Sequence, residues 1–371
     1  MTATSTVTPA RRAVPPPLAP PPPLTPDDER RAGELINFMS VLPQAALRAV
    51  ATLRVADLVA AGVDEVGALA AHAGVQPDRL LRVLRYLAVR GFVVEAAPGR
   101  FALTDLGQLL RDDHPLGLRA HFDLHGVTHR MEQAYEGLLG TLCTGEPAYR
   151  GTHGRDLYDD VEDEPGRTAA FTAQMSSRAQ PSARGLAALP GWADGQDVVD
   201  VGGGDGAHLA ELLTAHPHLR GTVVDLPATC RQAVRRFAAL GLGERARTAA
   251  GSFFDPLPAG ADAYLLCSIL IDWPDEDAVR VLTRCAEACR PGGAVLVVDW
   301  LRAEGANPVV TTHVDLHEMV LVGGRVRTPT EVAALAARAG LRHVATAPCG
   351  AGTTLLTLVP VTDGAAGDPP R

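Results

Sequence analysis

The stretch Asp197-Val-Val-Asp-Val-Gly-Gly-Gly-Asp-Gly206, followed by Ala207-His-Leu-Ala-Glu-Leu-Leu213, decides the fold of this chain. The apolar run 198–201 predicts a buried parallel strand, and the segment after the glycines predicts an amphipathic helix. Glycines at a strand-to-helix turn let a ligand lie against bare backbone, and the N-terminus of the helix offers free N–H groups. The stretch therefore predicts a cofactor-binding α/β domain.

Downstream of this stretch, apolar strand segments alternate with helical segments. The predicted strands are residues 197–201, 222–225, 245–249, 263–266 and 294–299, and a late helix at 331–340 is joined by strands at 343–347 and 353–359. Such an alternation predicts a doubly wound, Rossmann-like parallel sheet, and the closing pair of strands predicts an antiparallel insertion at one edge.

Upstream of this stretch, the chain divides into segments with different predicted structure. Residues 1–28 form a predicted disordered tail, because nine of the first 26 residues are Pro. Residues 29–118 are mostly helical, and a helix-turn-helix over 66–87 followed by a hairpin predicts a winged helix. The remaining predicted parts are a helical bridge that contributes to a substrate pocket (119–190), the cofactor domain (191–361) and a second tail (362–371).

The composition excludes several classes of protein. The 371 residues carry a net charge of −9, which argues against a nucleic-acid partner, although Arg79, Arg82 and Arg85 near the second helix of the winged helix leave that alternative open. All 34 basic residues are Arg, so a Lys Schiff base is excluded. The six Cys are scattered without a Cys-x-x-Cys, which indicates a reduced, cytoplasmic protein without a metal. No apolar run is long enough to span a membrane. An apolar excess in the first two helices favours a homodimer interface.

Three histidines, His121, His125 and His129, recur every four residues and are expected to share one helix face. The outer pair would lie about 12 Å apart at the helical rise, which rules out a three-His metal site on one helix. One of them, His125 in particular, is a candidate for lining a substrate pocket.

The candidate cofactor site extends beyond the glycines. Asp200 precedes them within the strand, and the next strand ends at Asp225, where a carboxylate can accept hydrogen bonds from both hydroxyls of a ribose. Phe253 and Trp273 follow later strands and would supply aromatic surface beside an adenine. The glycine spacing alone also fits a loose dinucleotide pattern, which is weak evidence by itself.

These pieces together resemble the plant-type, caffeate-like O-methyltransferases that use S-adenosylmethionine, and especially their actinobacterial relatives that modify polyketides. The matching segments are Asp200-Val-Gly-Gly-Gly-Asp-Gly206, Val224-Asp-Leu-Pro227, Gly251-Ser-Phe-Phe-Asp255, Ile271-Asp-Trp-Pro-Asp275, Arg290-Pro-Gly-Gly293 and Gly323-Gly-Arg-Val-Arg-Thr328. The resemblance implies S-adenosyl-L-methionine as cofactor and an N-terminal dimerisation domain. The cofactor contacts that it implies are Asp200, Gly202, Gly204, Asp225, Leu226, Ser252, Phe253, Cys267 and Trp273. Ser252 stands where the family usually has an Asp.

The chain departs from this family at the catalytic base. Plant members carry His-Asp-Trp, and the His is their general base, whereas this chain has Ile271 in its place. Of the two carboxylates that support that His in the family, Asp299 is kept as an acid and the other position is Val326. Candidate replacements are His317 and Glu318, in a segment that lines the substrate pocket of relatives. The predicted catalytic residues are therefore His317, Glu318 and Asp299, and the predicted substrate contacts are His125, Met175, Ile271 and His317.

Three functions follow from this pattern. The first is methyl transfer from S-adenosylmethionine to an oxygen of a small aromatic, polyketide-like natural product, mainly by proximity. The second is a noncanonical reaction on the same fold, such as hydroxylation, decarboxylation or cyclisation. The third is a non-enzymatic ligand-sensing dimer. The motifs favour the first.

Overall fold

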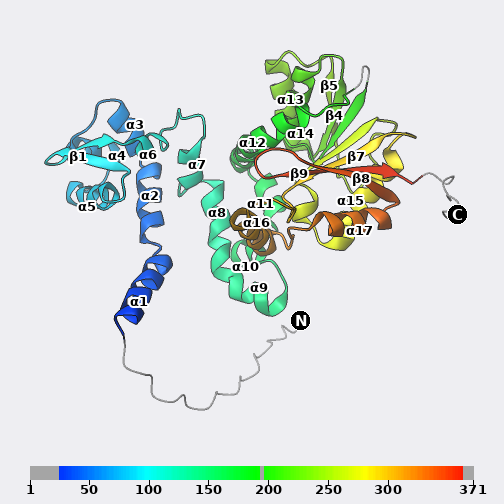
Figure 1. Ribbon diagram of the computed structural model, residues 1–371. Coiled ribbons are helices and arrows are strands. Elements are labelled where there is room, and N and C mark those ends of the chain that lie inside the picture. The colour runs from blue at the N-terminus through cyan, green and yellow to red at the C-terminus, as the bar shows by residue number, and fades with distance from the viewer. Residues whose placement is uncertain (1–24, 193–195, 362–371) are drawn as a thin grey trace, which may run out of the picture. The chain divides into compact units, whose positions relative to one another are not determined.

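A computed structural model describes residues 25–192 and 196–361 (Figure 1). Most of the predicted N-terminal tail, and all of the predicted C-terminal tail (362–371), lie outside the described residues. Helix α1 (Pro26–Met39) begins where the side chain of Thr25 accepts a hydrogen bond from the Asp28 N–H at 3.2 Å, so residues 26–28 are helical rather than part of a tail. The described chain divides into two units after Ala46, within helix α2 (Leu42–Thr52). In the first unit, the apolar side chains of Leu35 and Ile36 are 59% and 67% exposed.

The second unit begins with a helical region closed by a hairpin. Helices α3 (Val55–Ala60), α4 (Val66–Ala73) and α5 (Pro77–Ala88) are followed by the antiparallel strands β1 (Val93–Ala97) and β2 (Arg100–Leu103) and by helix α6 (Asp105–Gln108). Leu80, Leu84 and Leu87 recur at helical spacing on α5 and are buried. The helices and the hairpin lie where the sequence predicts them, while the winged-helix assignment and its part in dimerisation stay predictions.

Short helices connect this region to the sheet. They are α7 (Leu118–Phe122), α8 (Val127–Gln133), η1 (Ala134–Gly137), α9 (Leu138–Thr144), α10 (Ala148–His153), α11 (Leu157–Glu162) and the long α12 (Pro165–Ala187). The expectation that His121, His125 and His129 share one helix face is wrong. The backbone turns extended at Asp123, whose side chain accepts a hydrogen bond from the His125 N–H at 3.0 Å, and α8 restarts after Gly126. The three histidines therefore lie on α7, on a connection and on α8.

The rest of the chain forms one seven-stranded sheet in the order β5-β4-β3-β6-β7-β9-β8 (Figure 1). Its strands are β3 (Asp197–Val201), β4 (Arg220–Asp225), β5 (Ala246–Ala250), β6 (Ala263–Cys267), β7 (Ala294–Asp299), β8 (Leu341–Pro348) and β9 (Thr354–Pro360). The first five pair in parallel, and β9 lies antiparallel between β7 and β8. This confirms the predicted parallel sheet with an antiparallel insertion at one edge.

Helices cover both faces of this sheet because successive strand side chains point to opposite sides. Val199 and Val201 pack with α15 (Asp275–Ala288) and α17 (Pro329–Arg338), while Val198 packs with the other helix layer. That layer consists of α12, α13 (Ala207–Ala215) and α14 (Pro227–Ala239). The carboxyl ends of the parallel strands share one edge, which is where doubly wound sheets bind ligands.

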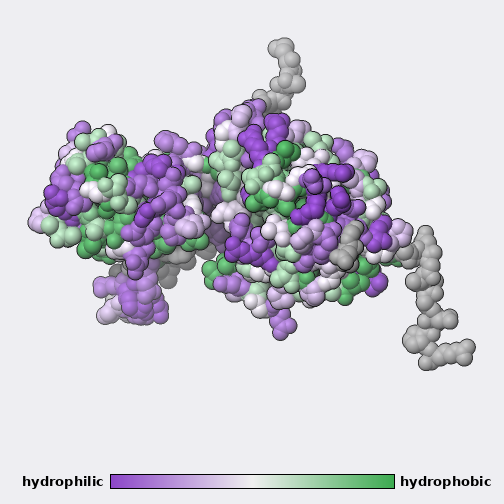
Figure 2. All heavy atoms as spheres, turned by 90° about the horizontal axis from the view of Figure 1, so that it is seen from above, coloured by the Kyte–Doolittle hydropathy of each residue, from purple (hydrophilic) through white to green (hydrophobic). Residues whose placement is uncertain are grey.

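The outer surface mixes polar and apolar residues. On the side seen in Figure 2, hydrophilic areas are interspersed with smaller hydrophobic ones. Within residues 25–192 and 196–361, no helix combines the length and the apolar character needed to cross a membrane.

Candidate active site

The glycine turn after β3 is shaped by packing on two sides and is open on the third. Gly202, Gly204 and Gly206 all have positive φ, of 68°, 62° and 76°. A Cβ on Gly202 would lie 2.5 Å from the side chain of Ile269, and one on Gly206 would lie 2.5 Å from Phe237. A Cβ on Gly204 would meet no described atom within 4 Å. Only Gly204 therefore faces free space, and a ligand can approach the backbone there.

Asp225 fixes this turn from the end of the neighbouring strand. Its Oδ2 accepts a hydrogen bond from the Gly204 N–H at 2.8 Å, and its Oδ1 accepts one from the Leu226 N–H at 2.7 Å. Burial raises the pKa of Asp225, and these two backbone donors oppose that rise. The side chain of Thr229 is a third hydrogen-bond partner, and the carboxylate still has a lone pair with which to accept a bond from a ribose hydroxyl.

The side chain of Asp200 packs against the glycine turn. It is fully buried, and neither of its carboxyl oxygens has a hydrogen-bond partner among the described residues. Burial, and then the charge of Asp225, raise the pKa of Asp200 to about 7. A Cβ on Gly203 would lie 2.5 Å from Cγ of Asp200, so the carboxyl packs directly against the glycine backbone.

A cluster of aromatic side chains lies beside the glycine turn. The ring of Trp273 meets Phe253 edge-on at 5.8 Å between centroids and Phe254 edge-on at 4.9 Å. Tyr158 from α11 stacks on Trp273 at 6.3 Å between centroids with an interplanar angle of 14°. Ser252 accepts a hydrogen bond from the Phe254 N–H at 3.2 Å through Oγ. Two more predicted site residues follow the strands: Cys267 ends β6, and Leu226 caps α14.

Ile271 is anchored as a buried apolar residue in the short helix η2 (Leu270–Asp272). It is 3% exposed, its N–H donates to Oδ2 of Asp299 at 3.1 Å, and its carbonyl accepts from the Arg325 N–H at 2.8 Å. The other oxygen of Asp299 accepts the Trp300 N–H at 2.9 Å. Burial, and then Asp272, raise the pKa of Asp299 to about 8. Asp299 therefore holds the backbone of this segment, with both oxygens occupied.

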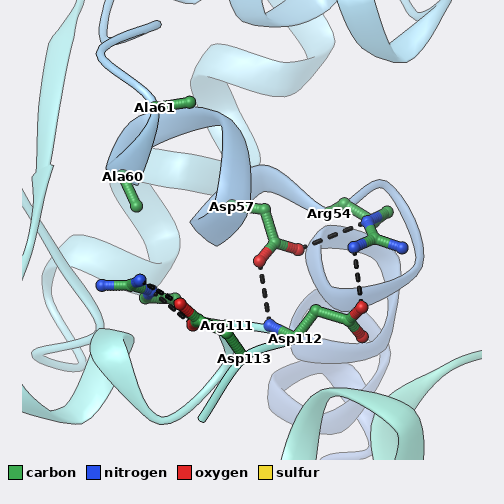
Figure 3. A pocket seen from close by; sticks show the side chains of 7 residues that line it. All are labelled: Arg54, Asp57, Ala60, Ala61, Arg111, Asp112 and Asp113. Carbon is green, nitrogen blue, oxygen red and sulfur yellow. Dashed lines mark hydrogen bonds and ion pairs between the residues drawn. The ribbon is translucent and has the colours of Figure 1, made fainter.

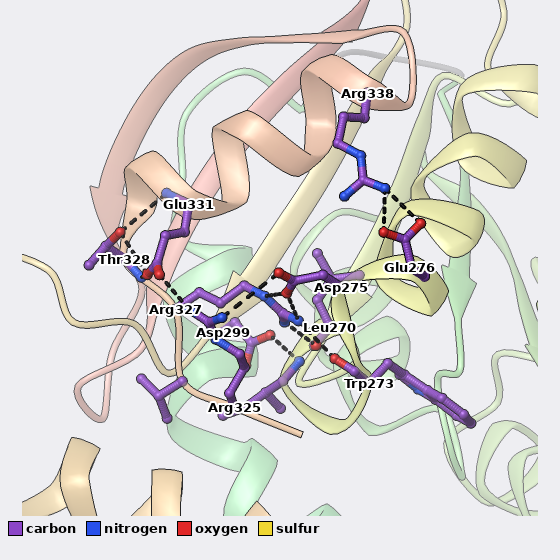
Figure 4. A network of polar contacts seen from close by, with 12 residues as sticks. Leu270, Trp273, Asp275, Glu276, Asp299, Arg325, Arg327, Thr328, Glu331 and Arg338 are labelled. Atoms are coloured by element: carbon purple, nitrogen blue, oxygen red, sulfur yellow. Dashed lines mark hydrogen bonds and ion pairs between the residues drawn. The ribbon is translucent and has the colours of Figure 1, made fainter. Parts of the chain in front are cut away.

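The segment after η2 is fixed by a buried arginine, Arg327 (Figure 4). Its guanidinium donates to Asp275 at 2.7 Å and 3.0 Å, to the carbonyl of Leu270 at 2.6 Å and to the carbonyl of Trp273 at 2.8 Å. Four hydrogen bonds from one planar group set the path of the chain from Leu270 to Asp275. This network orients Asp272 and Trp273.

Asp272 meets two other polar groups from distant elements. Its Oδ2 accepts a hydrogen bond from the hydroxyl of Tyr158, and a second bond joins it to Glu318 on α16 (Pro308–Leu321). Burial raises the pKa of Asp272 to about 6, and burial with the charge of Asp272 raises the pKa of Glu318 well above its usual range. Glu318 therefore keeps the proton, and Asp272 is the carboxylate of the pair above about pH 6.

This group of three hydrogen-bonded side chains includes one predicted residue and two that sequence reasoning missed. Glu318 was predicted, while Asp272 and Tyr158 were not. Asp272 lies inside the recognised Ile271-Asp-Trp motif, next to the family's base position, and this adjacency was the available signal. Tyr158 carried no signal, because α11 comes from a different part of the chain.

The remaining predicted residues lie on α16, on α12 and on the connection between α7 and α8. His317 directly precedes Glu318 on α16, and its Nδ1 is 2.6 Å from the hydroxyl of Tyr135. Burial, and then the charge of Arg178, lower the pKa of His317 to about 4, so its ring is neutral. Met175 is half-buried on α12. His125 is exposed on the connection between α7 and α8.

A separate hollow of about 440 Å³ lies between α3 and the segment after α6 (Figure 3). Its charged groups are already engaged with one another: Arg54 forms ion pairs with Asp112 at 2.8 Å and with Asp57 at 3.4 Å. It contains none of the predicted site residues, so it is not a candidate active site. Over the described ranges, no group of three or more His, Cys, Asp or Glu is arranged to hold a metal ion.

Comparisons with known proteins agree with this geometry. Residues 135–342 match the family model of the O-methyltransferase domain. The chain is 42% identical over 296 residues to the 2,7-dihydroxy-5-methyl-1-naphthoate 7-O-methyltransferase of Streptomyces carzinostaticus, covering 80% of this chain and 88% of that one. It is 41% identical over 312 residues to the aclacinomycin 10-hydroxylase RdmB of Streptomyces purpurascens, covering 83% of each.

A solved structure gives the same result. The O-methyltransferase NcsB1 from neocarzinostatin biosynthesis, in complex with S-adenosylmethionine and 2-hydroxy-5-methyl naphthoic acid, superposes with a TM-score of 0.82 at 39% identity. The match covers 88% of this chain and 98% of that structure. The chain therefore belongs to the O-methyltransferase family and is an S-adenosylmethionine-dependent O-methyltransferase.

Proposed function

We infer that the acceptor is a hydroxyl of a small aromatic, polyketide-like natural product. One relative supports this, since it is named as the 7-O-methyltransferase of a dihydroxynaphthoate. The aromatic rings around Trp273 also suit a flat aromatic substrate or the adenine of the cofactor.

The residues around the glycine turn fit S-adenosylmethionine. The open space at Gly204 leaves room for a ligand against the backbone, and Asp225 has a lone pair for a ribose hydroxyl. Phe253 and Trp273 would flank the adenine, and Ser252 offers a hydroxyl where the family usually has a carboxylate. The full set assigned to the cofactor is Asp200, Gly202, Gly204, Asp225, Leu226, Ser252, Phe253, Cys267 and Trp273.

The observation that carries the proposed mechanism is the hydrogen-bonded pair of Asp272 and Glu318 one residue beyond the apolar Ile271. When bound, the cofactor would supply a methyl group on its sulfonium sulfur, and S-adenosylhomocysteine would leave as the acceptor oxygen takes that methyl group. The chain contributes mainly by holding the acceptor oxygen in line with that methyl group. As the new C–O bond forms, the hydroxyl proton passes to the carboxylate of Asp272, which has a pKa suited to accept it near neutral pH.

The other predicted catalytic residues have supporting roles in this scheme. Glu318 keeps its own proton, donates a hydrogen bond to Asp272 and holds that carboxylate in place. Asp299 holds the Ile271 backbone, and Ile271 itself presents an apolar surface. Met175 and His317 are assigned to the substrate side, and His125 is the weakest of the predicted contacts because its side chain is exposed.

Turnover with S-methyl-labelled cofactor and a panel of aromatic hydroxy compounds tests this proposal. We expect product that carries the label, with one S-adenosylhomocysteine released for each product formed. Converted substrate without label would overturn methyl transfer and support a noncanonical reaction of the kind that the name of RdmB records. Asp225→Ala serves as the cofactor-site control, with an expected loss of binding free energy of roughly 1–3 kcal/mol.

We also propose that the protein is a cytoplasmic homodimer. The apolar residues around the α1–α2 connection support this, because Val41 and Leu42 are 75% and 58% exposed and monomers rarely expose such clusters. The six Cys form no disulfide, which fits a reducing compartment. Sedimentation at several protein concentrations measures the assembly, and a Val41→Glu, Leu42→Glu double variant should be monomeric.

A further inference from the structure

Helix α12 is joined to α14 by two hydrogen bonds that lie one helical turn apart. Gln232 donates to Oγ1 of Thr172 at 3.3 Å, and Arg236 donates to Oγ of Ser176 at 2.6 Å. Residues four positions apart lie on one side of a helix, so both bonds connect the same side of α12 with the same side of α14. Thr172 and Ser176 are buried in this contact. The two bonds therefore hold the middle of α12 against α14.

The bond from Arg236 also reaches the glycine turn. The same nitrogen, Nη2, donates to Oδ2 of Asp205, which lies between Gly204 and Gly206. Nη2 carries two hydrogens, so it can serve Asp205 and Ser176 at once. The side chain of Asp205 is only 12% exposed, and salt screens such a partly buried ion pair less than a surface pair. Arg236 thus joins the turn to α12.

These two bonds orient the guanidinium of Arg236. Its Nε is buried and has no hydrogen-bond partner within residues 25–192 and 196–361. An unsatisfied buried donor is unfavourable, so the two acceptors of Nη2 must offset it. A displacement of Asp205 would turn the guanidinium and break its bond to Ser176. Order in the turn and order in the middle of α12 are therefore linked.

The turn is open at the position where a ligand would lie. Gly206 packs against Phe237, the neighbour of Arg236 on α14, whereas Gly204 faces free space. A ligand against the backbone of Gly204 would restrict the turn on its open side. Asp205 is the next residue, so the same ligand would also fix the carboxylate that Arg236 binds.

The middle of α12 lies between two anchors that do not involve the turn. Near the start of the helix, Oγ1 of Thr168 donates to a carbonyl of α11 at 2.7 Å. Near its end, Oγ of Ser182 lies 2.9 Å from Nε2 of His208 on α13. Ser176 lies between these anchors, and Met175, which is assigned to the substrate side, directly precedes it. A shift of the backbone at Ser176 therefore moves Met175 as well.

We propose that Arg236 is a positioning residue that makes binding of the methyl acceptor depend on the cofactor. A cofactor against Gly204 fixes Asp205, and Arg236 then fixes Ser176. The wall of the acceptor pocket at Met175 is thereby ordered before the acceptor binds. A second ligand binds more tightly when the first has already ordered the segment that both require. This inference rests on the proposed function and adds to it a residue that touches neither the acceptor nor the reacting atoms.

Hydrogen exchange of the backbone amides of residues 172–178, measured with and without S-adenosylhomocysteine, tests this link on the whole protein without turnover. Ser176→Ala removes the bond to α12 and keeps the ion pair at the turn. Arg236→Met removes both. Gln232→Leu is the matched control, because it removes the other bond between α14 and α12, which does not reach the turn. Calorimetry gives the affinity of each variant for S-adenosylhomocysteine.

We expect S-adenosylhomocysteine to slow exchange in residues 172–178 of the native protein roughly fivefold or more, the lower end of typical coupling between two sites. Ser176→Ala should bind S-adenosylhomocysteine normally and lose this protection. Gln232→Leu should exchange faster in both states and keep the difference between them. In turnover with labelled cofactor, Ser176→Ala should raise KM for the acceptor several-fold and leave kcat nearly unchanged.

Four results would overturn the link: exchange in residues 172–178 does not respond to S-adenosylhomocysteine, Ser176→Ala keeps the full protection, Gln232→Leu loses it equally, or KM for the acceptor is unchanged in Ser176→Ala. Failure of S-adenosylhomocysteine to bind the native protein would overturn the link together with the cofactor site. Protection that depends on Ser176 and Arg236 without any labelled product would leave the link standing and refute methyl transfer.

Discussion

The hydroxyl of Tyr158 donates a hydrogen bond to Oδ2 of Asp272, although the two residues lie 114 positions apart in the chain. Glu318 joins the same carboxylate from a third element, α16. One tyrosine hydroxyl and one protonated carboxyl thus stabilise the charged form of Asp272 against the cost of burying it. This arrangement places a proton acceptor next to Ile271, where the family's usual base is missing.

The pH dependence of kcat/KM should report this carboxylate. Its pKa is raised to about 6, and only the deprotonated form accepts a proton, so the rate should fall tenfold per pH unit below about pH 6. Asp272→Asn should lower kcat roughly 10²- to 10⁴-fold and abolish this acid limb. Steady-state assays between pH 5 and pH 9, with a substrate whose hydroxyl ionises outside this range, measure both effects.

Variants of the two donors separate this mechanism from a general loss of activity. The bond from Tyr158 lowers the pKa of Asp272, so Tyr158→Phe should move the acid limb to higher pH. Glu318→Leu should do the same, whereas Glu318→Gln keeps a donor and should move it less. An acid limb that stays in place in Asp272→Asn would show that another group accepts the proton.

The buried Asp200 should make the ligand-free protein less stable as the pH rises. Its folded-state pKa is raised to about 7, so the stability present below the unfolded value is lost as the pH climbs through 7. Asp200→Asn cannot ionise, and it should gain stability relative to the native protein over this window, by up to about 4 kcal/mol. Urea unfolding at pH 5 and pH 8 gives the difference.

Asp197→Asn is the matched control for this prediction, because Asp197 is exposed at the start of the same strand. It should follow the native protein at both pH values. Equal pH slopes for the native protein and Asp200→Asn would mean that Asp200 is not charged and buried as described.

The sheet was predictable because its signals are local. The apolar run 198–201 and the glycines after it determine a strand and a turn within a few residues, and the strand segments were placed to within one or two residues of their observed ends. The shared face of His121 and His129 was predicted wrongly, because spacing cannot reveal that Asp123 interrupts the helix. Spacing assumes a continuous helix.

The candidate site was less predictable because its groups come from separate elements. Asp225 was found from its place at a strand end, where topology alone brings residues together. Tyr158, Asp272 and Glu318 meet only after α11, η2 and α16 have packed, so nothing in the local sequence links them. Glu318 was singled out only because it lies in a segment that lines the substrate pocket of relatives.

Arg327 should contribute far more to stability than its neighbour Arg325. Arg327 is 2% exposed and bonds Asp275 and the carbonyls of Leu270 and Trp273, so Arg327→Met leaves buried acceptors without donors. We expect a loss of about 3–5 kcal/mol in the free energy of unfolding. Arg325→Met removes a pair with a 44% exposed side chain and should cost only about 0–1 kcal/mol. Similar losses in urea titrations of the two variants would contradict the network in Figure 4.

Gly204 should be required for the ligand, whereas Gly202 and Gly206 are required for the fold. A Cβ on Gly204 meets no described atom, so Gly204→Ala should cost only the left-handed backbone strain, about 1–2 kcal/mol. The same Cβ enters the space assigned to the cofactor, so the affinity for S-adenosylhomocysteine should fall at least tenfold.

Gly241 is the matched control, since its φ is 67° and a Cβ there also meets no described atom within 4 Å. Gly241→Ala should lose the same stability and bind the cofactor product normally in calorimetry. Native-like affinity in Gly204→Ala would remove this turn from the cofactor site, and an equal loss of affinity in both variants would attribute the effect to strain alone.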